Sequence, residues 1–236
     1  MKPSSLILLS AAMSLCSAGA YARDSHNINR DWRFSPGDIP GAEAPAFDDS
    51  SWQTVNVPHD FQIHQPWVAP DASEKGDKTN EMANIASRLS SRGFKEMGRG
   101  WYRKTFTPDA SWNGQRVLLD FEGIMLVGDV WLNGERIGGT DYGYLGFESD
   151  ITGKIKYGEP NVIAVRADTG KPENSRWYTG GGIYRDVNIN VTDPKQYFTR
   201  HGLHITTPVV DPARSTVVVD AEMANYVKAD SLEVGI

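Results

Sequence analysis

The sequence predicts an all-β protein built as a β-sandwich or jelly roll. Short alternating or apolar runs follow one another at close spacing, turn residues separate them, and long helical periodicity is scarce. Hydrophobic residues make up 39% of the 236 residues, which is enough to bury a core and argues against wholesale disorder.

The first 22 residues have the pattern of a secretory signal peptide. Lys2 supplies a positive start, residues 6–15 form an apolar run too short to span a bilayer, and Ala20-Tyr21-Ala22 matches an A-x-A cleavage site. We expect cleavage after Ala22, a secreted or periplasmic product and no membrane attachment after cleavage. The single cysteine, Cys16, leaves with this segment, so no disulfide is expected.

Strand-like runs occupy the middle of the chain. They predict strands at residues 101–106, 116–121, 127–132, 135–138, 161–167 and 185–191. Asn133-Gly134 stands between two of these runs and predicts a tight hairpin, because both residues tolerate positive φ. In the last run, the apolar residues occupy the odd positions, as expected for a strand with one buried face.

Two further features divide the chain. Residues 64–100 are polar and predict a long surface loop with one short helix near residues 80–89. Thr192-Asp193-Pro194 predicts a domain boundary. Beyond it, two strands are expected at residues 202–206 and 216–221, and a third begins at 232–236. Three strands do not close a sandwich, so this second domain is expected to be incomplete.

Charge and motif content exclude several function classes. The formal charge of -6 disfavours nucleic acid, which requires clustered Lys and Arg. No zinc spacing, nucleotide-binding glycine motif or G-x-S-x-G elbow occurs, so we expect no cofactor and no metal. The pairs Asp120/Glu122 and Glu148/Asp150 are expected to face solvent, because nothing nearby offers the apolar pocket that an acid catalyst needs.

Six segments carry a resemblance to a known family. They are Trp52 with Val57-Pro58-His59-Asp60-Phe61, Gly100-Trp101-Tyr102-Arg103-Lys104, Asp120-Phe121-Glu122-Gly123, Val130-Trp131-Leu132-Asn133-Gly134, Asn161-Val162-Ile163-Ala164-Val165, and the run from Ser175 to Arg185. In this order they resemble the N-terminal sugar-binding domain of family 2 glycoside hydrolases, a group that includes β-galactosidases, β-glucuronidases and β-mannosidases. The last segment most resembles β-galactosidases.

The resemblance implies a galactose-binding-like jelly-roll β-sandwich over residues 23–193. Residues 194–236 would then begin an immunoglobulin-like β-sandwich that is incomplete. Members of the family are retaining enzymes whose two catalytic glutamates lie on a TIM barrel of about 250 residues. We expect that barrel to be absent from this chain, and we interpret Asn80-Glu81, which resembles the family's acid/base pair, as a coincidence. The chain alone is therefore expected to have no catalytic residue and no activity.

The same resemblance indicates which residues bind substrate. Arg176, Trp177 and Tyr178 stand beside a triple glycine and would reach toward the active-site pocket, where Arg176 donates to sugar hydroxyls and Trp177 packs on a ring. The alternative is a latch to the barrel. Asp60 would accept bonds either from sugar hydroxyls or from backbone N–H groups in a turn, and His59 is expected to pack.

Three functions remain open from the sequence. The leading hypothesis is the N-terminal part of a retaining hydrolase of terminal β-galactosides, with a catalytic barrel in cis or in trans as its partner. Seven Trp and nine Tyr also suit a non-catalytic carbohydrate-binding module, because aromatic planes pack on sugar rings. The third hypothesis is the non-catalytic subunit of a split enzyme.

Overall fold

The computed structural model describes residues 23–68, 93–170 and 178–224. The predicted signal peptide, the helix expected near residues 80–89 and the strand expected at 232–236 lie outside these ranges. The described residues form strands β1 (Asp24–Asn27), β2 (Trp32–Pro36), β3 (Gln53–Val55), β4 (Arg99–Phe106), β5 (Arg116–Phe121), β6 (Ile124–Met125), β7 (Val127–Leu132), β8 (Glu135–Thr140), β9 (Phe147–Asp150), β10 (Asn161–Asp168), β11 (Gly182–Ile183), β12 (Val187–Thr192), β13 (Tyr197–Val209) and β14 (Thr216–Ala224), with 3₁₀ turns η1 (Gln62–His64) and η4 (Ala110–Trp112).

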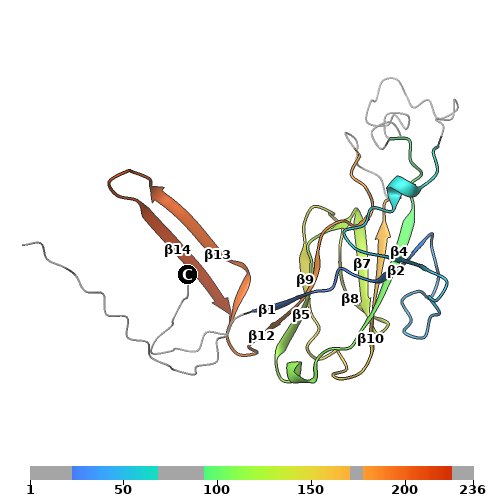
Figure 1. The fold of residues 1–236 in the computed structure, drawn as a ribbon, viewed down its shortest axis with the longest axis horizontal. Helices are drawn as coiled ribbons and strands as arrows, with labels where there is room; N and C mark the ends of the chain where they lie inside the picture. Colours follow the sequence, from blue (N-terminus) through green and yellow to red (C-terminus); the bar gives the residue numbers. More distant parts are fainter. Residues whose placement is uncertain (1–22, 69–92, 171–177, 225–236) are drawn as a thin grey trace, which may run out of the picture.

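Most strands belong to two antiparallel sheets that pack face to face as a sandwich (Figure 1). The smaller sheet has the order β1-β12-β5-β9, and the larger has the order β3-β2-β4-β10-β7-β8. β6 pairs with β11, and β13 pairs with β14 in a hairpin that forms a sheet of its own. The fold is therefore all-β, as the sequence predicts.

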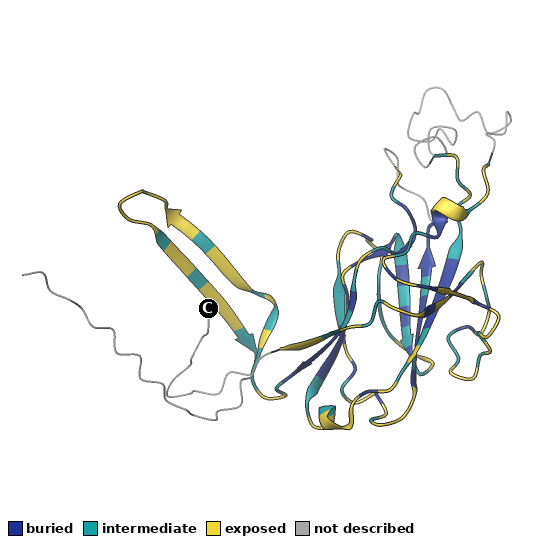
Figure 2. Cartoon of the chain, viewed as in Figure 1, coloured by how far each residue is buried: buried dark blue, intermediate teal, exposed yellow. Residues whose placement is uncertain are grey.

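Side chains that alternate along the strands fill the space between the two sheets. In β12, Val187, Ile189 and Val191 are buried, which confirms the predicted odd-position pattern. In β7, Val130 and Leu132 are buried in the same way. All five belong to one cluster with members from both sheets, and Figure 2 shows it as the buried interior of the sandwich. Burial of this apolar surface is the main favourable contribution to folding.

The predicted strand positions are confirmed for most of the sandwich. β5 and β7 have the predicted bounds, and β10 extends one residue further. The strand predicted at residues 185–191 begins later, at Val187. Asn133 and Gly134 have φ values of 52° and 87°, which confirms the tight hairpin between β7 and β8.

Other boundaries differ from the prediction for identifiable reasons. The polar loop predicted at residues 64–100 ends earlier, because β4 begins at Arg99 through pairing with β10. β1 was not predicted at all. Its residues are polar and mostly exposed, and it is a strand because it pairs with β12. Pairing with a distant strand leaves no periodic signal in the segment itself.

The larger sheet is also covered on its outer face, by the long connection between β2 and β3. Trp52 and Trp101 belong to a second buried cluster there. Trp131 stacks on Trp101 with ring centroids 5.3 Å apart. Tyr102, the next residue of β4, points into the main core and is fully buried. The middle of β4 is therefore buried on both faces.

Arg103 holds the β2–β3 connection against the outer face of the sheet. Its side chain is 2% exposed, and its Nε donates to Asp49 Oδ2 at 2.8 Å. The other guanidinium nitrogens donate to backbone carbonyls of the connection, at Ala42, Ala44, Pro45 and Phe47. A buried charge is costly unless it is paired and hydrogen-bonded. The path of this connection is therefore tied to one guanidinium.

The β13–β14 hairpin is attached to the smaller sheet at its base. Arg200 in β13 donates to Gly146 O and to Asp120 Oδ1, both at 3.0 Å. The Arg116 guanidinium lies 3.9 Å from the centre of the Tyr197 ring. Figure 2 shows most of the hairpin as exposed. Its exposed apolar residues are Phe198, Leu203, Ile205, Val209, Val217 and Val218. The immunoglobulin-like assignment of residues 194–236 stays a prediction.

Two of the four carboxylates expected to face solvent are instead largely buried in ion pairs. Asp120 on β5 and Glu148 on β9 lie opposite each other, and each side chain is only 14% exposed. Arg23 pairs with both, and Arg200 pairs with Asp120. The expectation was wrong for these two because their partners come from segments far away in the sequence. The other two carboxylates are exposed, as expected.

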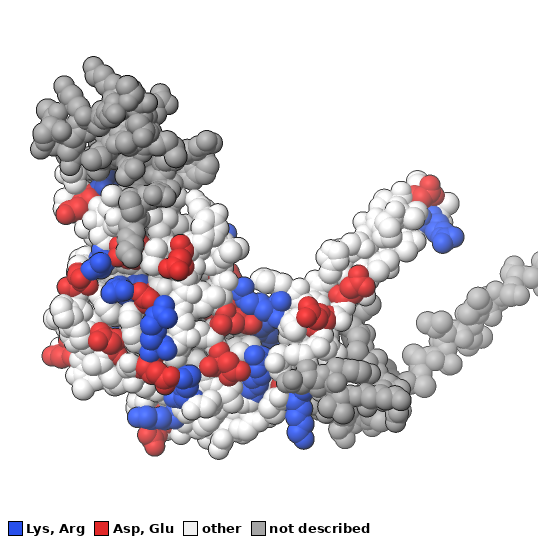
Figure 3. Space-filling model, turned by 180° about the vertical axis from the view of Figure 1, so that it is seen from behind, with Lys and Arg blue, Asp and Glu red and all other residues white. Residues whose placement is uncertain are grey.

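The surface charges are intermixed rather than gathered by sign. Figure 3 shows Lys and Arg beside Asp and Glu over the visible face of the sandwich. This distribution offers no basic stripe on that face for a nucleic acid backbone. Among the described residues, no helix is long and apolar enough to cross a membrane.

Replacing Arg103 with methionine tests its structural role. Arg103→Met leaves Asp49 and the carbonyls of the connection without their donor, and we expect the free energy of unfolding to fall by about 3–5 kcal/mol. Urea denaturation measures the loss. Arg33, opposite Arg103 on β2, is exposed, so Arg33→Met is the matched control and should cost less than about 1 kcal/mol. Equal losses in the two variants would contradict the assigned role.

Candidate functional site

The candidate site lies at the end of the sandwich that carries η1, the short cyan helix in Figure 1, where the segment before η1 meets β11. Two segments far apart in sequence run side by side there. His59 N donates to Ile183 O at 2.7 Å, and Phe61 N donates to Gly181 O at 2.9 Å. The segment around Asp60 and the glycine-rich segment around residue 181 therefore form one structural unit.

Asp60 is the centre of this unit. Its Oδ1 accepts from Gln62 N at 3.0 Å and from Gly181 N at 2.9 Å. Its Oδ2 accepts from the Tyr178 hydroxyl at 2.7 Å. The two bonds from backbone N–H groups match one of the two roles that the sequence left open for Asp60. The bond from Tyr178 brings together two residues that were predicted to bind substrate.

The glycines allow the two segments to approach closely. Gly180 and Gly182 have φ values of 73° and 117°, a region that other residues rarely adopt. A Cβ atom on Gly180 would lie 2.8 Å from Asp60 Oδ2, and one on Gly182 would lie 2.2 Å from the Tyr102 hydroxyl. The structure assigns these glycines to no turn, but their positive φ values and missing Cβ atoms let the backbone lie directly against Asp60.

A buried amide lies beside these glycines. Gln62 is 1% exposed, and its Oε1 has no hydrogen-bond partner. A Cβ atom on Gly181 would lie 3.3 Å from Gln62 Oε1 and 2.5 Å from Thr169 Cγ2. Buried polar atoms are nearly always paired. The close approach of Gly181 therefore leaves this amide enclosed rather than open to solvent.

His59 packs against neighbouring aromatic side chains, as the sequence predicts. Its ring lies edge-on to Phe34, and its Nδ1 is 2.8 Å from the Tyr102 hydroxyl. Burial lowers the pKa of His59, the nearby His64 lowers it further, and Asp60 opposes them. The folded protein therefore favours the neutral imidazole, as suits a packed histidine.

Tyr178 is the described member of the predicted Arg176-Trp177-Tyr178 group. Its side chain is 38% exposed while its hydroxyl is bonded to Asp60. Burial, followed by the hydrogen bond to Asp60, raises the pKa of Tyr178, so it stays a neutral donor at ordinary pH. Arg176 and Trp177 lie outside the described residues.

The sequence reasoning missed Trp67, on the segment that follows η1. This side chain is 73% exposed, and Lys95 Nζ lies 3.8 Å from its ring centroid. Lys95 also donates to Gln65 O at 3.0 Å, which fixes the cation over the ring. Ile63, within η1, is 54% exposed. A tryptophan inside a loop that is otherwise polar was the available signal.

These groups suit the binding of a polyhydroxylated ligand. The site offers a carboxylate, a tyrosine hydroxyl and aromatic surface, which together match sugar hydroxyls and C–H faces. In the parts of the chain that the structure describes, no group of three or more His, Cys, Asp or Glu residues could hold a metal ion.

A β-sandwich with such groups gathered at one end belongs to the class of sugar-binding sandwiches. The family model described as "Glycosyl hydrolases family 2, sugar binding domain" matches residues 25–194. The chain therefore belongs to glycosyl hydrolase family 2, as the sequence motifs indicate.

Relatives of known name agree with this assignment. The chain is 34% identical over 215 residues to the β-galactosidase BoGH2A of Bacteroides ovatus, covering 90% of this chain and 23% of the relative. It is 34% identical over 202 residues to a putative β-glucuronidase of Formosa agariphila, covering 86% and 18%. A β-glycosidase structure from Bacteroides vulgatus matches with a TM-score of 0.72 and 32% identity, covering 87% and 25%. The chain thus spans a quarter or less of the length of these relatives.

Removing the Asp60 carboxylate tests its part in joining the two segments. Asp60→Ala leaves the Gln62 and Gly181 amides without their acceptor, and we expect a loss of about 1–3 kcal/mol in unfolding free energy. Hydrogen exchange at the Gly181 amide should become faster. Tyr178→Phe removes one exposed bond and keeps both amides paired, so it is the milder control. Unchanged exchange at Gly181 in Asp60→Ala would contradict this role.

Proposed function

We propose that this chain is the N-terminal part of a retaining hydrolase of terminal β-galactosides. In this proposal, the sandwich positions a catalytic barrel that lies outside these residues, and the cluster around Asp60 lines the rim of the barrel's pocket. The observation that carries the proposal is the Asp60 cluster itself, in which Tyr178 and the glycine-rich segment are held at one end of the sandwich. Arg176 and Trp177, next to Tyr178 in sequence, would complete the rim.

The geometry of the cluster supports sugar contact at this rim. Tyr178 exposes aromatic surface while its hydroxyl is bonded to Asp60. A rigid site loses little conformational entropy when it binds. The bonds from Asp60 to two backbone amides supply that rigidity.

One observation favours a galactoside over a glucuronide. The β-galactosidase of Bacteroides ovatus matches more of this chain than the Formosa agariphila relative does, at equal identity.

We also propose that the mature protein begins at Arg23 and is secreted or periplasmic. Support comes from the signal-peptide pattern of residues 1–22. Mass spectrometry of the exported protein should give an N-terminus at Arg23. A cell-associated product that retains residues 1–22 would contradict the proposal.

Two chimeras test the proposed enzyme class. In one, this chain replaces the matching segment of the Bacteroides ovatus β-galactosidase; in the other, it replaces that of the Formosa agariphila relative, which is a control of equal identity. Each chimera is compared with its own parent enzyme. We expect the fraction of the parent's kcat/KM that remains to be about tenfold larger in the first chimera than in the second, because the rim of this chain suits a β-galactosidase barrel. Tyr178→Phe in that chimera should lower kcat/KM by up to about tenfold, as loss of a hydrogen bond would.

The unmodified chain serves as the negative control. It should not hydrolyse p-nitrophenyl β-galactoside above a boiled sample. Hydrolysis by the chain alone would overturn the proposed division between sandwich and barrel, and better retention in the glucuronidase chimera would overturn the galactoside assignment.

A further inference from the structure

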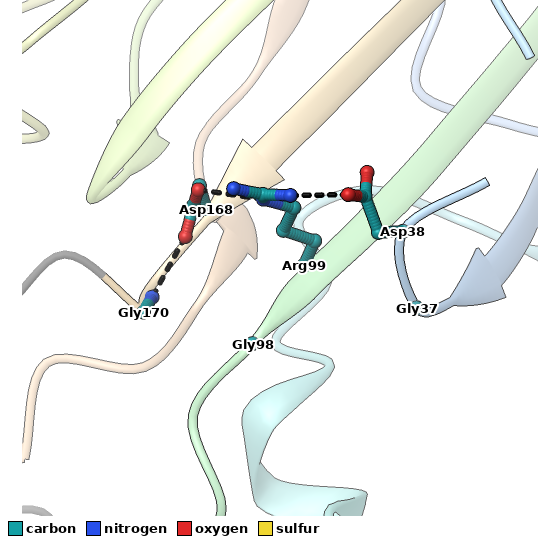
Figure 4. Close-up of a pocket in the computed structure, with 6 residues that line it drawn as sticks. All are labelled: Gly37, Asp38, Gly98, Arg99, Asp168 and Gly170. Atoms are coloured by element: carbon teal, nitrogen blue, oxygen red, sulfur yellow. Dashed lines mark hydrogen bonds and ion pairs between the residues drawn. The ribbon is translucent and has the colours of Figure 1, made fainter. Parts of the chain in front are cut away.

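A separate pocket opens near the Asp60 cluster. It has a volume of about 420 Å³ and is lined by Gly37, Asp38, Gly98, Arg99, Asp168 and Gly170 (Figure 4). These residues come from the ends of β2, β4 and β10. Pockets for small molecules have volumes of about 300–1,000 Å³, so the space admits a sugar ring. Thr169, whose amide donates to Gly98 O at 2.8 Å, lies between this pocket and Gly181.

One guanidinium between two carboxylates gives the pocket its polar character. Arg99 Nε donates to Asp168 Oδ2 at 2.8 Å, and Nη1 pairs with Asp38 (Figure 4). Gly170 N donates to Asp168 Oδ1 at 2.8 Å, which fixes that carboxylate. The bond to Asp168 is the main cause that raises the pKa of the Arg99 guanidinium, which therefore stays charged. The three side chains carry a formal charge of -1 at neutral pH.

This charge pattern selects among classes of ligand. An anion would meet two carboxylates, and a cation would meet the guanidinium that stands between them. A neutral hydroxyl avoids both penalties, because it can donate to a carboxylate and accept from a guanidinium at once. The pocket therefore suits an uncharged polyol.

The glycines leave the pocket open to a ring. A Cβ atom placed on Gly37 or Gly98 would meet no other atom within 4 Å. Gly98 also lacks the positive φ that makes substitution strained. The space in front of its backbone is therefore free, and a side chain introduced at Gly98 would enter it.

We propose that this pocket is a second carbohydrate site, which binds one neutral sugar ring. Arg99 and Asp38 bond its hydroxyls, and the glycine backbone forms the surface beneath it. The site is distinct from the Asp60 cluster and does not depend on the proposed catalytic role of the chain.

Calorimetry on the whole chain tests the proposal, with methyl β-D-galactopyranoside and D-glucuronate as probes. We expect the galactoside to bind with a Kd of about 1 mM and the glucuronate at least about tenfold more weakly. Gly98→Leu should abolish galactoside binding. Gly153→Leu is the matched control, because Gly153 also lacks positive φ and close neighbours, and binding should be unchanged.

A charge variant supplies a second readout that does not depend on filling the pocket. Asp38→Asn removes one negative charge beside Arg99. The ratio of the Kd for glucuronate to the Kd for the galactoside should therefore fall. Asp38 lies at an exposed position, so this variant should keep its melting temperature. If Gly98→Leu unfolds at a lower temperature than the unmodified chain, the test of the second site rests on Asp38→Asn.

Three results would overturn the second site. The first is galactoside binding that survives Gly98→Leu in a folded variant, and the second is equal affinity for the two probes in the unmodified chain. The third is binding that Tyr178→Phe abolishes and Gly98→Leu does not, since the sugar would then sit at the Asp60 cluster. The third result would contradict the second site but not the proposed function. Inactive chimeras would contradict the proposed function but not the second site.

Discussion

The loop end of the sandwich depends on the bonds that converge on Asp60. Its two oxygens accept from Gln62 N, Gly181 N and the Tyr178 hydroxyl, and so join segments more than a hundred residues apart. Without this carboxylate, two amides in a crowded region lose their acceptor. A structural role and a sugar-binding role are compatible here, because a carboxylate has about four lone-pair positions and three are occupied.

β4 connects this end to the rest of the molecule. Its residues alternate in direction, so that Arg103 and Trp101 hold the β2–β3 connection on the outer face while Tyr102 points inward to His59. Arg99, where the strand begins, lines the second pocket. A strand buried on both faces has little freedom to shift. The position of both candidate sites is therefore set by the packing of one strand.

Features that depend on the local residue pattern were predicted from the sequence. Features that depend on contacts between distant segments were missed. Apolar or alternating runs located β5, β7 and β12, and Asn133-Gly134 located the hairpin between β7 and β8. β1 has no such pattern, because only pairing with β12 makes it a strand. The sequence singled out the triple glycine, yet the bond from Gly181 N to Asp60 joins residues that are far apart in the sequence. The triad of Asp38, Arg99 and Asp168 was likewise hidden, since its members adjoin only once β2, β4 and β10 are assembled.

Charge links the two candidate sites to the question of substrate. The named relatives include both β-galactosidases and β-glucuronidases, so family membership leaves the sugar open. In this chain, the rim carries Asp60 and the second pocket carries two carboxylates around one guanidinium. At the proposed second pocket, a uronate would face a net negative charge, because two carboxylates flank one guanidinium. At the proposed rim, Arg176 would offset the charge of Asp60, so the rim gives no such preference. The charge argument for a neutral sugar therefore rests on the second pocket alone.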